Sequence, residues 1–355
     1  MSGRDMNGRD VSSPSAGSGA PLLRISDLSV QFRSDGEWGT AVDDVAIDVA
    51  AGRTLAIIGE SGSGKSATAR AVMGVLPESG SRITSGRIEI DGDDVLTMKR
   101  RRRDEVNGTR MAMVFQDAMS ALNPVLPIGY QVGEGLRVHR KMSRRRANER
   151  AVELLGQVGI PDPRRRVASF PHELSGGTLQ RVMIAMSISC DPDLLIADEP
   201  TTALDVTIQA QILELLVELK ESRGMGLVLI THDLGVVAGV ADDIVVMYAG
   251  RVVERGTADQ VYDQPEHPYT QALLDAIPRP AQRGGPLPMI AGKPPSLMNK
   301  PDGCSFRPRC AHAIDDCMTP ADLTEVAPGH HSRCHLAEPV GSAGPGRAAG
   351  VEITS

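Results

Sequence analysis

The sequence predicts an α/β protein built around a mainly parallel sheet with helices on both faces. Three short apolar runs, at residues 54–58, 194–197 and 227–230, have the length and composition of buried strands. Each run ends in a polar or glycine-rich turn, and helical patterns separate the runs. Strands that alternate with helices along the chain are typical of parallel sheets.

The first run leads into a phosphate-binding loop. Residues 59–66, GESGSGKS, match the pattern G-x-x-x-x-G-K-[ST]. The glycines let successive N–H groups point at phosphate oxygens, Lys65 would reach the β- and γ-phosphates, and the Ser66 hydroxyl would ligate Mg²⁺. The alternative is an accidental match, but the strand before the loop and a predicted helix at 67–76, ended by Pro77, favour the functional interpretation. The nucleotide-binding residues predicted here are Gly59, Ser61, Gly62, Ser63, Gly64, Lys65, Ser66 and Ala67.

The run at 194–197 ends in two carboxylates, Asp198 and Glu199. We expect Asp198 to hold Mg²⁺, in part through water, and Glu199 to orient and polarise the water that attacks the γ-phosphate. An acidic turn before Pro200 is the structural alternative. Phosphoryl transfer needs a phosphate loop and a metal-side carboxylate together, so the presence of both favours a catalytic pair.

Three further stretches have helical character. Ser143 can cap a helix that runs to about residue 158 and stops at Gly159, and Cys190 lies in another stretch with helical character. A stronger apolar stripe follows residue 205 and ends near Gly224. The stripe residues are Val152, Leu155 and Val158 in the first helix, and Ile208, Ile212, Leu215, Leu216 and Leu219 in the second.

Composition places the chain among large soluble proteins. It has 355 residues and 41% hydrophobic content, which is enough for a buried core. No apolar run approaches the ~20 residues of a membrane span. The start lacks the apolar core of a signal peptide, so we expect a cytosolic protein with disordered tails at 1–20 and 339–355.

Charge argues against a nucleic-acid partner. The net charge is −7, whereas general nucleic-acid binders have a basic bias. Basic runs occur at 99–103, 144–146 and 164–166. Solvated helix faces are the preferred interpretation of these runs, over contacts with RNA or lipid.

Four more motifs carry a family resemblance. Gln116 lies in MVFQD (113–117), a glycine box reads LSGGTLQR (174–181), ALD occupies 203–205, and His232 lies in LITHD (229–233). In this order they resemble the motifs of ABC-transporter ATPases, over residues 22 to 275. The resemblance implies a P-loop NTPase core with an antiparallel β part, and a helical subdomain at about 117–185 that contacts the permease.

The resemblance also implies a composite active site. Two ATPase domains would pair head to tail, so that Ser175, Gly176 and Gly177 of one bind the γ-phosphate held by the phosphate loop of the other. His232 would contact the γ-phosphate, Asp205 would couple the two sites, and Gln116 would ligate Mg²⁺ and move with the membrane partner. The pair Thr178-Leu179 departs from the commonest family pattern.

An aromatic residue that stacks on adenine is expected upstream of the phosphate loop. Two aromatic residues lie in that region, Phe32 and Trp38. Trp38 stands in the glycine-flanked segment DGEWG (35–39), which has the composition of a turn. We therefore favour Phe32, with Trp38 as the alternative.

The C-terminal third resembles the extension on ATPase subunits of oligopeptide and dipeptide importers. The segments that carry this likeness are PEHPYT (265–270), IAGKPPSL (290–297) and GCSFRPRC (303–310). The expected organisation is an ATPase domain at 21–275 and an extension at 276–338. This part discriminates most strongly between subfamilies.

Four of the five cysteines fall within 31 residues of that extension, spaced C-x5-C-x6-C-x16-C. Disulfides are disfavoured in a reducing cytosol, so soft-metal ligation is the better interpretation. Four thiolates suit a [4Fe–4S] cluster or structural zinc, and the resemblance favours the cluster. Zinc is the second interpretation and unligated thiols the third, while His330 and His331 are expected as polar surface residues. The predicted ligands are Cys304, Cys310, Cys317 and Cys334.

Taken together, the motifs predict the ATP-hydrolysing subunit of an ABC importer for peptides, at the cytoplasmic face of the membrane. Expected partners are a second, related but non-identical ATPase chain, two permeases and, indirectly, an extracytoplasmic binding protein. Nickel chelates, glutathione-like thiols or oligosaccharides are the alternative cargo. A soluble non-transport ABC ATPase would need two such domains or a long coiled coil, and a metal sensor would not need Glu199 and His232.

Overall fold

The computed structural model describes residues 20–202, 204–277, 290–296 and 298–340. Apart from Ala20, Pro339 and Val340, the predicted tails at 1–20 and 339–355 lie outside these ranges, and so do Ala203 of the ALD motif and Leu297. Within the described ranges, none of the helices has both the length and the apolar character needed to cross a bilayer.

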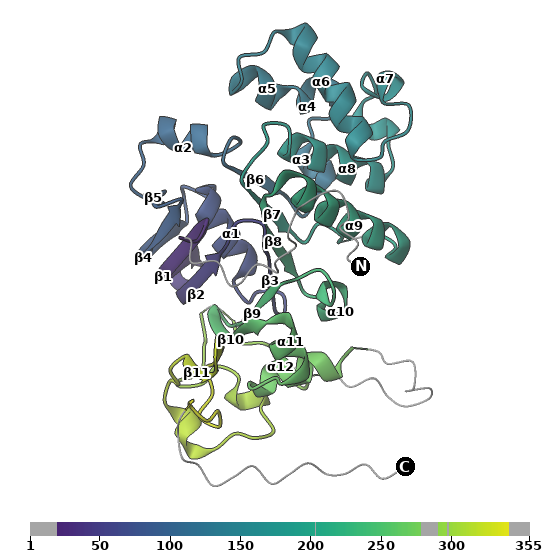
Figure 1. The fold of residues 1–355 in the computed structure, drawn as a ribbon. Helices are drawn as coiled ribbons and strands as arrows, with labels where there is room; N and C mark the ends of the chain where they lie inside the picture. The colour runs from purple at the N-terminus through teal and green to yellow at the C-terminus, as the bar shows by residue number, and fades with distance from the viewer. Residues whose placement is uncertain (1–19, 203, 278–289, 297, 341–355) are drawn as a thin grey trace, which may run out of the picture.

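An eight-stranded sheet forms the centre of the molecule (Figure 1). The strand order is β11-β12-β10-β9-β3-β8-β7-β6. The five strands from β9 to β6 are parallel to one another. The pairs β9–β10, β10–β12 and β12–β11 are antiparallel. The predicted mainly parallel α/β fold is therefore confirmed. The strands are β3 (Thr54–Ile58), β6 (Met111–Val114), β7 (Leu194–Asp198), β8 (Gly226–Thr231), β9 (Asp243–Tyr248), β10 (Arg251–Thr257), β11 (Thr324–Ala327) and β12 (His330–Ser332).

A second, antiparallel sheet has the order β2-β1-β4-β5 and provides the expected antiparallel part. Its strands are β1 (Leu23–Ser34), β2 (Glu37–Val49), β4 (Ser81–Ile90) and β5 (Asp93–Asp94). Strand β3 is buried on both faces, because Leu55 and Ile57 pack toward this sheet and helix α1. Ala56 and Ile58 pack toward helices α8 and α9 on the other face. Two apolar cores therefore enclose the central strands.

The helices cover both faces of the large sheet, and α3 to α8 gather at the end of the molecule farthest from the C-terminal region (Figure 1). This cluster coincides with the stretch predicted as a helical subdomain. The helices are α1 (Lys65–Met73), α2 (Arg100–Val106), α3 (Ala118–Ala121), α4 (Ile128–Val132), α5 (Glu134–Val138), α6 (Arg144–Gln157), α7 (Pro163–Arg166), α8 (Gly176–Ser187), α9 (Val206–Arg223), α10 (Leu234–Val237), α11 (Ala258–Asp263) and α12 (Pro268–Asp275).

Two helix boundaries differ from the prediction. Helix α1 begins at Lys65 and ends at Met73, because Gly74 adopts a left-handed conformation (φ 64°) and terminates the helix before Pro77. Cys190 is not helical: α8 ends at Ser187, and Cys190 lies in the turn before β7. Pro192 disfavours helical backbone at Asp191, which has φ 51°. Helices α6 and α9 end next to Gly159 and Gly224, as predicted.

The C-terminal region continues the large sheet, because β12 pairs with β10. His330 of β12 is not a surface residue: it is buried, and its Nε2 lies 2.8 Å from the buried Glu254 carboxylate of β10. Burying the Glu254 carboxylate requires hydrogen-bond partners, which His330 and two backbone N–H groups provide. Phe306 packs against Tyr248 and Tyr269, with both ring centroids 5.3 Å away. The cysteine-containing region is thus packed onto the ATPase core.

Candidate active site

A cavity of about 570 Å³ lies at the carboxyl ends of the central parallel strands. The phosphate loop follows β3, Gln116 follows β6, Glu199 follows β7 and His232 follows β8. Because parallel strands all end at one edge of the sheet, four distant segments deliver side chains to one place. The lining residues are Phe32, Ala41, Glu60, Ser61, Gly62, Ser63, Gly64, Lys65, Ser66, Ala67, Gln116, Glu199 and His232.

The phosphate loop approaches neighbouring backbone so closely that two of its positions require glycine. A Cβ on Gly59 would lie 2.2 Å from the carbonyl oxygen of Met247, and one on Gly64 would lie 2.6 Å from that of Ala41. Both glycines also have positive φ. Gly250 N–H donates to the Ser63 carbonyl at 2.9 Å and holds the loop from outside. The loop is therefore a rigid backbone cradle.

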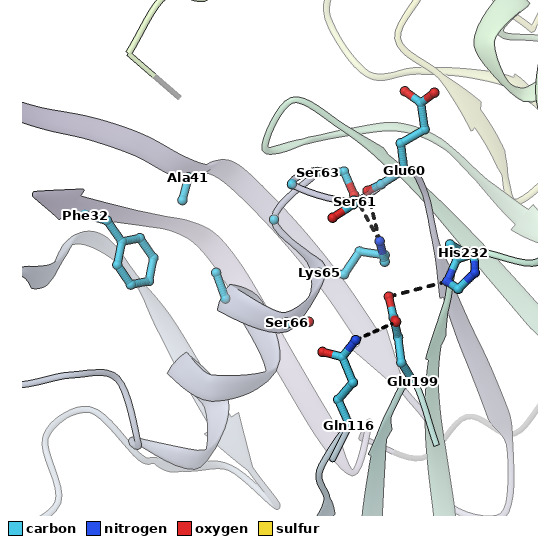
Figure 2. A pocket seen from close by; sticks show the side chains of 13 residues that line it. Phe32, Ala41, Glu60, Ser61, Ser63, Lys65, Ser66, Gln116, Glu199 and His232 are labelled. Carbon is cyan, nitrogen blue, oxygen red and sulfur yellow. Dashed lines mark hydrogen bonds and ion pairs between the residues drawn. The ribbon is translucent and has the colours of Figure 1, made fainter. Parts of the chain in front are cut away.

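Lys65 lies at the centre of this cradle (Figure 2). Its Nζ donates to the carbonyl oxygens of Gly59, at 2.7 Å, and Glu60, at 3.0 Å. Burial lowers the pKa of Lys65, and the nearby carboxylates Glu199, Asp198 and Glu60 oppose that shift. The ammonium group is held where an anionic ligand in the loop would meet it.

Ser66 and Asp198 provide adjacent oxygen atoms beside the loop. The Ser66 hydroxyl donates to Asp198 Oδ1 at 2.7 Å. Burial raises the pKa of Asp198, and this hydrogen bond acts in the opposite direction. A hydroxyl and a carboxylate next to a phosphate site fit Mg²⁺, which takes one or two protein oxygens and completes its shell with water and phosphate.

Glu199 faces the cavity and is oriented by three side chains (Figure 2). Its Oε2 accepts hydrogen bonds from Gln116 Nε2 and Thr202 Oγ1, both at 2.9 Å, and its Oε1 lies 3.5 Å from His232 Nδ1. Glu199 also has φ 47°, an uncommon backbone conformation that is found at functional sites. A carboxylate fixed in this way can orient and polarise water. Thr202 was not predicted from sequence, although its place three residues after Glu199 in one turn is a usable signal.

The glycine box and Asp205 do not line this cavity. Ser175 is exposed at the N-terminus of α8, where its Oγ accepts from Thr178 N, and Gly177 packs against Ile208 of α9. Asp205 is exposed and caps α9, with Oδ1 accepting from Ile208 N at 3.0 Å. The structure therefore brings together the predicted residues of the phosphate loop and strand ends, and leaves the box on the surface.

Phe32 lines the cavity on the side away from His232 (Figure 2), whereas Trp38 does not line it. Trp38 belongs to β2, and its ring lies under the Arg82 guanidinium at 4.2 Å. The geometry therefore favours Phe32 as the aromatic platform. Ala41, also on β2, completes this wall and was not predicted.

The four clustered cysteines line one small cavity, together with His267 and Phe306. Burial raises the pKa of Cys304, Cys310 and Cys334 and so disfavours their free thiolates. Over the described ranges, no group of three or more His, Cys, Asp or Glu side chains is arranged to hold a metal ion. The cysteines are therefore gathered without forming a metal-binding arrangement in this structure.

Comparisons with known proteins match both halves of the chain. The family model described as ABC transporter matches residues 42–202, and the one described as oligopeptide/dipeptide transporter, C-terminal region, matches residues 253–317. A putative peptide import ATP-binding protein of Brucella abortus (strain 2308) is 49% identical over 89% of this chain and 95% of its own length. The dipeptide transport ATP-binding protein DppD of Escherichia coli (strain K12) is 48% identical over 88% and 96%.

Solved structures agree on the fold. A dimeric post-hydrolysis state of the ATP-binding cassette MJ0796, bound to ADP and Pi, superposes with a TM-score of 0.60 at 27% identity. It covers 67% of this chain and 99% of that chain. CbiO1 of Clostridium perfringens, part of an ABC transporter complex, gives a TM-score of 0.58 at 27% identity.

We predict that Glu199→Gln lowers ATP turnover by about 100-fold or more while ATP binding is retained, because the amide keeps the shape but loses the base. Steady-state phosphate release and equilibrium nucleotide binding would be measured side by side. Glu218→Gln, on the exposed face of α9, is the matched control and should turn over normally. Wild-type turnover in Glu199→Gln would remove Glu199 as the catalytic carboxylate.

We also predict that Phe32→Ala weakens ATP binding by roughly 5-fold to 100-fold, the worth of one base stacked on an aromatic ring. Binding of inorganic tripolyphosphate, which has no base, should not change. Trp38→Ala is the control and should bind ATP like the wild type. Equal losses for ATP and tripolyphosphate would show that Phe32 shapes the loop instead of contacting the base.

Proposed function

The chain belongs to the ABC transporter family of ATPases, and from that premise we propose that it powers an importer of oligopeptides or dipeptides. The observation that carries the proposal is the combination, on one chain, of a cavity lined by the phosphate loop, Gln116, Glu199 and His232 with a C-terminal region of the oligopeptide/dipeptide transporter type. The match to peptide-import relatives along 88–89% of the chain supports the same cargo. Nickel chelates, glutathione-like thiols or oligosaccharides are the alternatives.

The hydrolytic chemistry follows from the side chains already placed. Loop N–H groups and Lys65 would bind the phosphates, and Ser66 and Asp198 would hold Mg²⁺, with Gln116 as a further ligand. Mg²⁺ supplies charge neutralisation on the phosphate oxygens. Glu199, held by Gln116, Thr202 and His232, would orient the attacking water and accept its proton, while His232 would also contact the γ-phosphate.

A single chain would provide only part of each composite site. Ser175, Gly176 and Asp205 are exposed and lie outside the cavity, which leaves them free to face the nucleotide of a second ATPase chain. The N-terminus of the 12-residue helix α8 presents N–H groups and the Ser175 hydroxyl for that contact. We propose a related, non-identical chain as the partner, with ATP binding closing the pair and hydrolysis reopening it.

A groove beside Gln116 supports a permease contact. This cavity of about 340 Å³ is lined mainly by apolar side chains, including Met113 of β6, Phe115 just after β6, and Met183 and Met186 of α8. Phe115 is partly exposed and precedes Gln116, so movement of a bound permease segment would reach the active site through one peptide unit. We place the protein at the cytoplasmic face of the membrane, with two permeases and, indirectly, a substrate-binding protein.

We further propose that an ATPase domain at 21–275 carries an extension at 276–338 whose four cysteines hold a [4Fe–4S] cluster, with zinc as the alternative. All four cysteine residues line one cavity, together with His267, His312 and His335, and thiolates are the usual ligands of iron–sulfur clusters and of structural zinc. The cluster would fasten a region with few apolar residues of its own.

The importer proposal predicts that short peptides stimulate ATP hydrolysis by the complex of this chain, its permeases and its binding protein in lipid vesicles. The phosphate released would be measured with a peptide panel, with nickel chelates, with glutathione and with oligosaccharides. Glu199→Gln is the matched negative control. Stimulation by one of the other compounds and not by peptides would keep the ATPase and reject the peptide cargo.

The metal proposal predicts that the double variant Cys304→Ser/Cys310→Ser loses the iron, or zinc, that copurifies with the wild-type protein. Elemental analysis and the visible absorbance of the anaerobically purified chain would be measured. Cys190→Ser is the matched control, because Cys190 is buried in the core away from the cluster of four. Unchanged metal content in the double variant would overturn the proposal.

A further inference from the structure

Arg309, which lies between residues 304 and 310 of the C-terminal region, contacts the phosphate loop. Arg309 belongs to the short 3₁₀ helix η2 (Arg307–Arg309), which Cys304 and Cys310 flank. Its guanidinium forms a two-pronged ion pair with the Glu60 carboxylate, with Nη1 2.6 Å from Oε2 and Nη2 3.0 Å from Oε1. The two residues are 249 positions apart in the sequence. Glu60 is the second residue of the phosphate loop and lines the nucleotide cavity.

The orientation of Arg309 is set by the C-terminal region and by β9, independently of Glu60. Nε donates to the Ala291 carbonyl at 2.8 Å, and Nη2 lies 3.4 Å from the Ile290 carbonyl. Nη1 also donates to the Tyr248 hydroxyl at 3.2 Å. The Arg309 side chain is only 4% exposed. The guanidinium is therefore held in place, and a planar fork held in place is the geometry that fixes a carboxylate.

Glu60 is restrained on its backbone as well as on its side chain. Its N–H donates to the Tyr269 hydroxyl at 2.8 Å, and its carbonyl accepts from Lys65 Nζ. The Glu60 side chain turns away from Lys65 (Figure 2), yet its negative charge is close enough to oppose the lowering of the Lys65 pKa, so it also acts on a polyphosphate bound beside Lys65. Without a cation beside it, that charge would repel the phosphates across a partly desolvated space.

We propose that Arg309 is a positioning residue for ATP binding, which acts by neutralising and fixing the Glu60 carboxylate of the phosphate loop. The affinity of the site for ATP would thereby depend on the folded C-terminal region. The inference rests on the nucleotide site of the proposed function and not on the cargo. An importer assay without a peptide response would leave it intact.

The test compares ATP affinity in Arg309→Gln, Arg309→Lys, Glu60→Gln and the double variant Glu60→Gln/Arg309→Gln of the full chain, measured by titration with a fluorescent ATP analogue. Arg309→Gln should weaken binding by about tenfold or more, because the Glu60 carboxylate is then unpaired beside the phosphates. Arg309→Lys keeps the positive charge but cannot form the two-pronged ion pair, so its ATP affinity should lie between those of the wild type and Arg309→Gln. The double variant should return to within about threefold of Glu60→Gln, because the unpaired charge is gone.

A matched control separates this effect from loss of an ion pair in general. Arg53 forms a comparable two-pronged pair with Asp243 at the other end of β9, at 2.9 and 3.0 Å, and neither residue lines the cavity. Arg53→Gln should leave ATP affinity unchanged. Arg309→Gln binding ATP within twofold of wild type would overturn the proposal, and so would a double variant as weak as Arg309→Gln. If Arg309→Gln does not fold, wild-type affinity in Arg309→Lys alone would overturn it.

Discussion

The close approach of the phosphate loop to backbone on either side is the constraint on which the site depends. Gly59 lies against the end of β9, and Gly64 lies against residue 41 of β2, at separations that leave no room for a Cβ. These contacts fix the loop between the parallel sheet and the antiparallel sheet. Lys65, at the start of α1, is fixed with it. A nucleotide that enters this loop meets donors that are already in position, so little reorganisation is needed at the moment of reaction.

The strand order places the other polar residues of the site next to the fixed phosphate loop. Strand β3 lies between β9 and β8, and β7 and β6 follow on the same side. The ends of β8, β7 and β6 therefore present His232, Glu199 and Gln116 in sequence along one edge, and each contacts the next through Glu199. Glu199, the proposed catalytic carboxylate, lies between His232 and Gln116, and Gln116 follows Phe115, which lines the groove proposed to bind the permease. The strand order thus connects the proposed hydrolytic site to the groove that is proposed to bind the permease.

Local patterns predicted the parts of this site whose geometry is local. The loop motif, the carboxylates at the end of β7 and the cap at Ser143 each follow from a few neighbouring residues. The predicted end of α1, at residue 76, was wrong. The helix ends at Met73 because Gly74 adopts a left-handed backbone conformation, which hydrophobic periodicity does not reveal. His330 is buried against Glu254, which is 76 positions away in the sequence, and Arg309 pairs with Glu60, which is 249 positions away. Local patterns do not reveal contacts over such separations. The choice between Phe32 and Trp38 depended on which residue of the β1–β2 hairpin lines the cavity.

In the proposed assembly, this chain holds one nucleotide and offers Ser175 and its glycine box to another. A structure of the assembled complex with ATP and Mg²⁺, made with Glu199→Gln to stop turnover, tests it most directly. We expect one ATP between the phosphate loop of this chain and the glycine box of the second ATPase chain. The Ser175 hydroxyl of this chain should lie within hydrogen-bond distance of a γ-phosphate held by that chain. An ATP enclosed by this chain alone, with Ser175 in solvent, would rule out a composite site.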